Sequence, residues 1–219
     1  KETSEIVFTS GTTNSMNMIV SGFFRNYLKR DDEVLVTLSE HASNILPWFI
    51  LQKEIGIKVK YIELNDKHEV TVENVKKAIN NKTKVISLAH ITNVIGDERP
   101  IKEITDYAHK HNILVVLDAA QSAPHVKIDV ENLGVDFMGF SGHKMCGPTG
   151  IGVLYGKYEL LNKLNPQNVG GGMNNDFESN MTYRYKELPY RLEAGTPNIE
   201  GVIGLGSAID YINSIGINN

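Results

Sequence analysis

The residues best suited to chemistry lie between positions 140 and 152, where the sequence reads FSGHKMCGPTGIG. Lys144 comes directly after an apolar, strand-like stretch and just before a glycine-rich turn. An amine nucleophile must reach a pocket from a rigid base, and a strand end in an α/β sheet provides one. Most lysines, however, are solvated surface residues. Evidence that Lys144 does covalent chemistry must therefore come from the residues around it.

Hydrophobic periodicity predicts the framework that would hold this lysine. Short apolar runs rich in β-branched residues predict seven strands, at 5–9, 33–37, 58–63, 84–89, 113–118, 137–141 and 152–155. Amphipathic stretches at 14–29, 44–55, 72–80 and 101–111 predict helices, the last two opened by Thr71 and Pro100. The alternation predicts a three-layer α/β/α domain with a mostly parallel seven-stranded sheet. Only about ten residues join the last two strands, so the seventh can run antiparallel.

Polar side chains follow the carboxyl ends of five predicted strands. In chain order these residues are Thr12, Thr13, His41, Asn93, Asp118, Gln121, Ser141, His143 and Lys144. Because the carboxyl ends of parallel strands meet at one edge of a sheet, residues far apart in the sequence should line a single crevice there. Loops that are polar for unrelated reasons do not explain this coincidence well.

The first of these segments is SGTTN at residues 10–14, which runs from a predicted strand into a predicted helix. Hydroxyl groups, a glycine and free backbone N–H groups at a helix N-terminus form a cradle for a phosphate. Ordinary helix capping by Ser10 or Thr13 is the alternative interpretation, and the motif alone does not decide between the two.

A phosphate cradle, a lysine amine, a strand-end carboxylate and an imidazole match the needs of pyridoxal 5'-phosphate. Lys144 would hold the cofactor as a Schiff base. Asp118 would keep the pyridine nitrogen protonated, so that the ring can accept the electrons of a carbanion. A dinucleotide site lacks its signature, because SGTTN and not GxGxxG follows the first strand, and the chain has no GxxxxGK[ST] loop. The residues therefore favour pyridoxal-phosphate chemistry with Lys144, His41 and Asp118 as catalytic groups.

Composition narrows the class of protein further. The chain has 219 residues, 41% of them hydrophobic, which suits one α/β domain. The net charge is -4 and the basic residues are scattered, which argues against nucleic acid as a partner. No apolar run approaches the roughly 18 to 20 residues of a membrane span, and the polar start KETSE has no signal-peptide core. These features predict a cytoplasmic protein without a membrane partner.

At these residues the chain resembles a known family. The segments FTSGTTN, SEHASNILPW, HITNVIG, LDAAQSAPH, FSGHKMCGPTGIGVLYGK and LEAGTPN are similar to those of class V aminotransferases, which are fold-type I pyridoxal-phosphate enzymes. Within the family they are closest to the cysteine desulfurase and selenocysteine lyase group. The resemblance runs from Phe8 to about Gly206 and implies the large, cofactor-binding domain of that fold. It also implies an activity that releases sulfur or selenium from an amino acid and leaves alanine.

The resemblance assigns a role to each candidate residue. Lys144 would carry the Schiff base and His41 would stack on the ring. Asp118 would pair with the pyridine nitrogen, and Gln121 would reach the phenolic oxygen. Thr13, Ser141 and His143 would hold the phosphate with Thr12 close by, Asn93 would lie near the substrate carboxylate or the ring oxygen, and Thr196 would reach the phosphate of a neighbouring subunit.

The role of Thr196 implies a homodimer. We interpret the long, polar, glycine-rich segment 166–189, which leads toward Thr196, as a functional or partner-facing loop. The resemblance further implies a small amino-acid substrate and allows a sulfur-acceptor protein as a partner. It predicts no metal.

Two parts of the family pattern fall outside this sequence. The nucleophilic cysteine and the carboxylate-binding arginine of the desulfurases belong to a carboxy-terminal region beyond Asn219, so residues 1–219 are predicted to be the large domain without its N-terminal segment and small domain. Cys146 is predicted to be a packed small hydrophobe. The alternatives that stay open are another class V lyase, transaminase or epimerase, and a catalytically incomplete fragment that binds pyridoxal phosphate.

A few further residues receive structural interpretations. Trp48 is expected in the core. His90, at the end of the fourth predicted strand, could belong to the site or be a satisfied core histidine. Asp97, Glu98 and Arg99 are interpreted as turn residues before Pro100.

Overall fold

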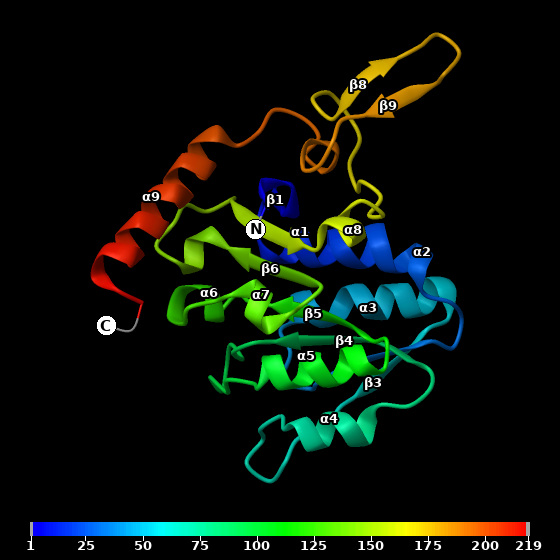
Figure 1. The fold of residues 1–219 in the computed structure, drawn as a ribbon, viewed down its shortest axis with the longest axis vertical. Coiled ribbons are helices and arrows are strands. Elements are labelled where there is room, and N and C mark those ends of the chain that lie inside the picture. The colour runs from blue at the N-terminus through cyan, green and yellow to red at the C-terminus, as the bar shows by residue number, and fades with distance from the viewer. Residues whose placement is uncertain (1, 218–219) are drawn as a thin grey trace.

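A seven-stranded sheet forms the centre of the computed structural model, which describes residues 2–217 (Figure 1). Its strands are β1 (Ile6–Thr9), β2 (Glu33–Val36), β3 (Lys58–Tyr61), β4 (Thr83–Ala89), β5 (Leu114–Asp118), β6 (Phe137–Ser141) and β7 (Gly152–Gly156). Their order across the sheet is β1-β7-β6-β5-β4-β2-β3. β7 pairs antiparallel with β1 and β6, whereas the pairs from β3 to β6 are parallel. The predicted strands, the mostly parallel sheet and the antiparallel seventh strand are confirmed.

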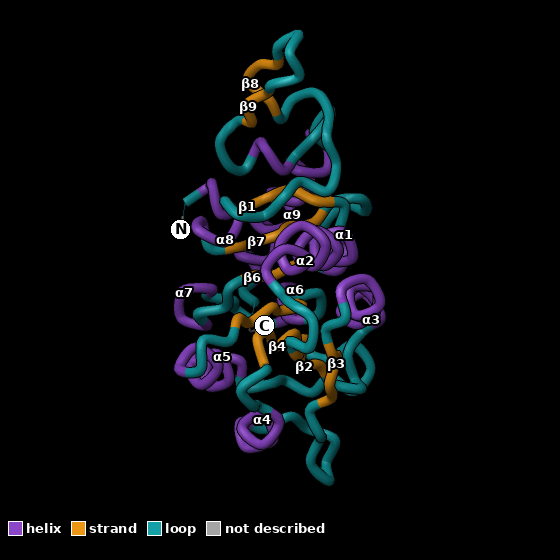
Figure 2. The backbone as a smooth tube through the Cα atoms, turned by 90° about the vertical axis from the view of Figure 1, so that its right-hand side faces the viewer, coloured by secondary structure: helices purple, strands orange, loops and turns teal. Residues whose placement is uncertain are grey.

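Helices cover both faces of this sheet, as the three-layer prediction requires. They are α1 (Thr12–Asn17), α2 (Arg25–Tyr27), α3 (Ala42–Ile55), α4 (Val72–Ala78), α5 (Ile101–Lys110), α6 (Ser122–His125), α7 (Val130–Leu133), α8 (Tyr158–Leu161) and α9 (Ile199–Ile215). Figure 2 shows α1 and α3 on one side of the strands and α5 and α7 on the other. Single helical turns lie at Thr3–Glu5, Gly142–Lys144 and Tyr190–Leu192.

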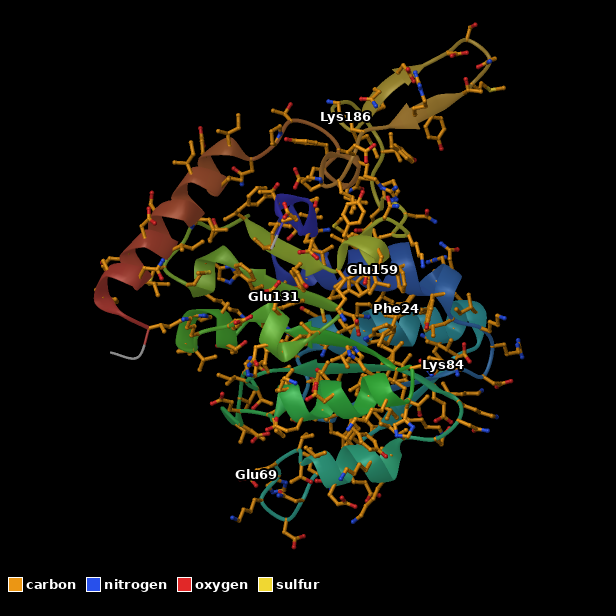
Figure 3. All side chains as sticks on the ribbon, in the orientation of Figure 1. Phe24, Glu69, Lys84, Glu131, Glu159 and Lys186 are labelled. Carbon is orange, nitrogen blue, oxygen red and sulfur yellow. The ribbon has the colours of Figure 1, made fainter. Side chains whose placement is uncertain are left out.

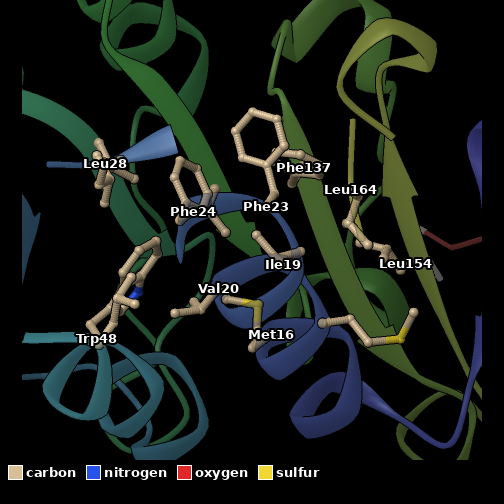
Figure 4. Packing of buried hydrophobic residues seen from close by; sticks show 14 of the residues in the cluster. Met16, Ile19, Val20, Phe23, Phe24, Leu28, Trp48, Phe137, Leu154 and Leu164 are labelled. Atoms are coloured by element: carbon tan, nitrogen blue, oxygen red, sulfur yellow. The ribbon is translucent and has the colours of Figure 1, made fainter. Parts of the chain in front are cut away.

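The strand residues alternate between two separate cores. Val34, Val36 and Val116 belong to the core under α1 and α3, while their neighbours Leu35 and Val115 belong to the core under α4 and α5. Side chains that point in turn to opposite faces, both covered, explain why these strands read as unbroken apolar runs. In the first core Phe24 packs against Trp48 with ring centroids 5.1 Å apart (Figure 4). The prediction that Trp48 lies in the core is confirmed.

The helix starts follow local chemistry. Thr71 caps α4 by accepting a hydrogen bond from the backbone N–H of Asn74 at 3.1 Å, as predicted. The predicted helix 14–29 is more complex, because a π-helical stretch (Met18–Phe24) joins α1 to α2. Within it a Cβ on Gly22 would lie 2.5 Å from the Asn165 carbonyl oxygen, so this glycine permits close packing.

The segment 166–189 contains regular structure that the sequence interpretation missed. Strands β8 (Asn174–Phe177) and β9 (Tyr183–Tyr185) form an antiparallel hairpin that projects from the body of the molecule. Tyr183 and Tyr185 are two residues apart and therefore share one face, where their rings lie 5.1 Å apart. Figure 3 shows Lys186 at the base of this hairpin, far from Glu69 beside α4. A partner-facing role for this hairpin stays a prediction.

A buried ion cluster fastens the amino-terminal edge of the sheet. Asp136 accepts hydrogen bonds from the Val115 amide at 2.7 Å, from Lys157 Nζ at 2.6 Å and pairs with His109 Nε2 at 2.9 Å. Burial alone would raise the pKa of Asp136, but these bonds outweigh it and hold that pKa below its ordinary value of 3.8.

We expect Asp136→Asn to lower the free energy of unfolding at pH 7 by about 3 kcal/mol, because the Lys157 ammonium loses the carboxylate with which it is paired. The folded-state pKa is depressed, so this stability is present above the ordinary pKa of 3.8 and is lost as the pH falls through the folded value. Urea unfolding should therefore separate variant and parent at pH 7 and bring them together in acid. The exposed pair of Asp176 and Arg184 provides the control, because Asp176→Asn should leave the midpoint unchanged.

One further observation concerns membranes. Within residues 2–217 no helix is long and apolar enough to cross a bilayer.

Candidate functional site

The polar residues that follow the strands line one cavity at the carboxyl edge of the sheet. Its volume is about 250 Å³. The predicted residues on its wall are Thr12, Thr13, His41, Asn93, Asp118, Gln121, Ser141, His143 and Lys144. Ser43, Ala89, Ile91 and Ala120 complete the wall, and the sequence analysis did not select them. The crevice expected from the topology is therefore present, while the role of each residue stays a prediction.

Hydroxyl groups gather where α1 begins. The Thr12 amide donates to Ser141 Oγ at 2.8 Å, and the two hydroxyls are also 2.8 Å apart. Close backbone approach makes this possible, since Gly11 has φ 141° and a Cβ on Gly152 would lie 2.5 Å from the Gly11 Cα. Thr13 Oγ1 lies 2.7 Å from Ser43 Oγ. The end of β6 thus meets the start of α1, and together they present several donors to an anion.

His41 occupies the N-cap of α3. Its Nδ1 accepts a hydrogen bond from the Ser43 amide at 3.2 Å, which orients the exposed ring beside the cavity. Because the cap fixes Nδ1 as the acceptor, Nε2 carries the proton in the neutral ring.

Asp118 is the buried carboxylate of the site. It is 4% exposed, and its Oδ1 accepts a hydrogen bond from the Ala120 amide at 2.9 Å. Burial raises the pKa of Asp118, and the nearby carboxylate of Glu40 adds to this rise, whereas Ala120, Lys144 and His41 oppose it. A cationic N–H donor bound in the cavity would stabilise the ionised form of this carboxylate through a charge-assisted hydrogen bond.

Lys144 ends the helical turn Gly142–Lys144, directly after β6, and is half-buried at the cavity wall. The turn is compact because Gly142 and Gly147 leave no room for a Cβ. Cys146 then takes a φ of 60° and is exposed, so the prediction of a packed small hydrophobe is wrong. The left-handed conformation that the tight turn imposes directs this side chain away from the core.

Thr196 lies apart from the other predicted residues. It borders a second cavity of about 290 Å³, with Ser10, Asn14 and Gln167 also on its wall. Its segment is tied to the body by Glu193, whose carboxylate accepts from the Phe8 amide at 2.7 Å. Burial raises the pKa of Glu193, an effect that the Phe8 amide opposes.

Behind the cavity lies a buried ion pair that sequence reasoning missed. Arg99 is interpreted from the sequence as a turn residue before Pro100, but its side chain is fully buried and contacts the equally buried carboxylate of Glu40. Sequence reasoning missed this contact because the Glu40 carboxylate lies 59 residues away from Arg99, on another loop. His90 is also buried, which lowers its pKa although Glu98 opposes this. Its Nδ1 has no hydrogen-bond partner among the described residues, and His90 is not among the residues that line the cavity.

The donor set fits pyridoxal phosphate. Hydroxyls and amides at the start of α1 suit the phosphate, and the Lys144 amine lies on the cavity wall. Asp118 is a buried acid whose carboxylate accepts a hydrogen bond from a backbone amide. In residues 2–217 no three His, Cys, Asp or Glu side chains gather as they would around a metal ion.

Comparison with known proteins identifies the family. The sequence pattern described as aminotransferase class V matches residues 1–219. The chain therefore belongs to the class V aminotransferase family, as the resemblance predicted.

The individual relatives are more specific. The chain is 47% identical over 215 residues to a probable cysteine desulfurase of Halalkalibacterium halodurans, covering 98% of this chain and 53% of that protein. Its structure is similar to that of the cysteine desulfurase CsdA of Escherichia coli, with a TM-score of 0.94, 38% identity, and coverage of 98% of this chain and 54% of the other. A structure described as SspA in complex with cysteine matches with a TM-score of 0.78 and 31% identity, over 95% of this chain and 55% of the other. The chain spans about half the length of these relatives.

Proposed function

We propose that this chain forms the pyridoxal-phosphate-binding part of a cysteine desulfurase or selenocysteine lyase, which releases sulfur or selenium from its amino-acid substrate and leaves alanine. The observation that carries the proposal is the convergence of Lys144, Asp118 and His41 on one cavity beside the hydroxyls of α1. The names of the relatives support the choice of cysteine.

The bound cofactor would supply an electron sink for negative charge at the substrate α-carbon. Lys144 would hold it covalently through Nζ and later move a proton at the α-carbon. Asp118 would accept a hydrogen bond from the ring nitrogen, and His41 would cover one face of the ring. Thr12, Thr13, Ser141 and His143 would bind the phosphate, with Gln121 toward the phenolic oxygen and Asn93 toward the substrate.

The test is turnover by the intact protein loaded with pyridoxal phosphate. With L-cysteine or L-selenocysteine and a thiol reductant we expect sulfide or selenide, and alanine in an equal amount. Transfer of the amino group to a keto acid would instead identify a transaminase, and racemised substrate an epimerase. If none of the three appeared while the cofactor bound normally, the proposed chemistry would be wrong and cofactor binding alone would remain.

We also propose a homodimer in which Thr196 of one protomer lies near Thr13 and Ser141 of its partner. The support is that Thr196 lies at the wall of a different cavity from these residues within one chain. Light scattering should then report a dimer of the intact protein, and Thr196→Ala should weaken cofactor binding by about tenfold, the loss of one hydrogen bond to a charged group. A monomer with parental affinity for the cofactor would contradict this. A sulfur-acceptor protein as a partner and a cytoplasmic location stay predictions.

A further inference from the structure

The ion pair between Glu40 and Arg99 lies directly behind the cavity and joins the two loops that supply part of its wall. We propose that this pair, called the clamp below, fixes the positions of His41 and Asn93 relative to the bound cofactor. The inference rests on the proposed function for the identity of the cofactor, but the clamp itself is a property of the chain.

Glu40 receives four donors from separate parts of the fold. Besides Arg99, its carboxylate accepts from Thr37 Oγ1 at 2.8 Å, from Asn44 Nδ2 at 2.8 Å and from the Ala89 amide at 2.7 Å. Both oxygens are engaged, because Thr37 and Arg99 bind Oε1 while the other two bind Oε2. The carboxylate therefore joins the end of β2, the first turn of α3 and the end of β4.

Arg99 closes the network from the opposite side. Its guanidinium donates to the Ala89 carbonyl at 3.2 Å, to Thr37 Oγ1 at 2.9 Å and to Ser39 Oγ at 2.8 Å. Its own amide donates to the His90 carbonyl at 2.9 Å. A planar fork with several fixed donors can hold all these acceptors together, which a lysine ammonium cannot.

The two clamped loops carry cavity residues. His41 follows Glu40 immediately, and Asn93 and Ile91 lie between the β4 end and Arg99. The same strand end bears on Asp118, because Ala89 pairs with Asp118 in the sheet and the His90 amide donates to the Asp118 carbonyl at 2.9 Å. A shift of the pair would thus displace the wall residues that follow β2 together with those on β4 and β5.

A buried ion pair is weak evidence for stability, since neutral replacement of both partners is often tolerated. This allows stability and positioning to be separated by a double variant. Glu40→Gln leaves the buried Arg99 with only the Asp97 carboxylate, 3.8 Å from its Nε, and Arg99→Met leaves the buried Glu40 without a cation, so each should lower the melting temperature. Together they leave neither charge of the pair, so E40Q/R99M should recover much of that loss.

The fixed positions of the two loops, in contrast, should not be restored in E40Q/R99M. Without cofactor, we expect the Ala89 amide and the backbone of residues 37–44 and 89–99 to exchange hydrogen about tenfold faster than in the parent. With pyridoxal phosphate bound, we expect a weaker visible circular dichroism band and a kcat for cysteine lowered by roughly 100-fold, the effect of a displacement near 1 Å. If the double variant does not fold, Arg99→Lys takes its place in the test. This variant keeps the charge but not the fork of donors, and it should show the same local increase in exchange.

Lys157→Met is the matched control, because it removes a cation from a buried cluster at the opposite edge of the sheet. It should lower stability while leaving exchange in 37–44 and 89–99 and the visible band unchanged. A folded E40Q/R99M or Arg99→Lys protein with parental exchange in both segments would overturn the positioning role. A parent that bound no pyridoxal phosphate would refute the proposed function instead, and the exchange measurements would still decide on the clamp.

Discussion

Lys144→Ala should reduce turnover of L-cysteine by at least about 1,000-fold. In the proposed function the Lys144 amine would be the nucleophile, and it would also transfer the proton at the α-carbon, a role that by itself contributes up to about 10,000-fold in enzymes. Steady-state assays of sulfide release by the intact, cofactor-loaded protein would measure the loss.

The control for this variant is Lys163→Ala, an exposed lysine that follows α8. It should retain parental turnover, because its side chain lies on the surface. Methylamine added to Lys144→Ala should restore part of the rate if the missing group is an amine that moves a proton. A variant that kept more than a tenth of the parental rate would show that another base does this work.

Asp118→Asn should lower kcat by about 100- to 1,000-fold with a much smaller effect on KM. In the proposed function the carboxylate would stabilise positive charge on the ring nitrogen, which matters most when the substrate carries developing negative charge, so the loss should appear in the transition state. A neutral amide cannot replace it. Parallel kinetics of the two proteins across a cysteine titration would give both constants, and a near-normal kcat would contradict this role.

The same substitution should not destabilise the cofactor-free protein. Burial raises the pKa of Asp118 above its ordinary value of 3.8, so the folded state binds the proton more tightly than the unfolded state. The parent should therefore lose stability as the pH rises from the ordinary to the raised value, whereas Asp118→Asn should not. Unfolding midpoints at several pH values would show the difference, and a lower midpoint of the variant at neutral pH would mean that the asparagine side chain does not fit the fold at this position.

The fold and most of the cavity wall could be predicted because both depend on local patterns and one topological rule. Runs such as those of β4 and β5 are apolar since both faces of the sheet are covered, and parallel strands bring their following residues to one edge. His41, Asp118 and Lys144 therefore gathered as expected although more than 100 residues separate the first from the last.

The missed features depend on contacts that no local pattern records. Arg99 is buried because Glu40 and three further oxygen acceptors surround it, and all four lie ten or more residues away in the sequence. Cys146 is exposed because close approach of glycines fixes a left-handed turn. The hairpin β8–β9 carried a readable signal, the alternation of Tyr183, Arg184 and Tyr185, but polar composition concealed it.

The attachment of the cofactor to the chain offers the most direct test of the proposed site. The intact protein should be incubated with pyridoxal phosphate, reduced with borohydride, digested and analysed by mass spectrometry. We expect a single phosphopyridoxyl group on the peptide that contains Lys144, and none in Lys144→Ala. The modification of a different lysine, or of no lysine in a protein that remains folded, would contradict the assignment of the cavity.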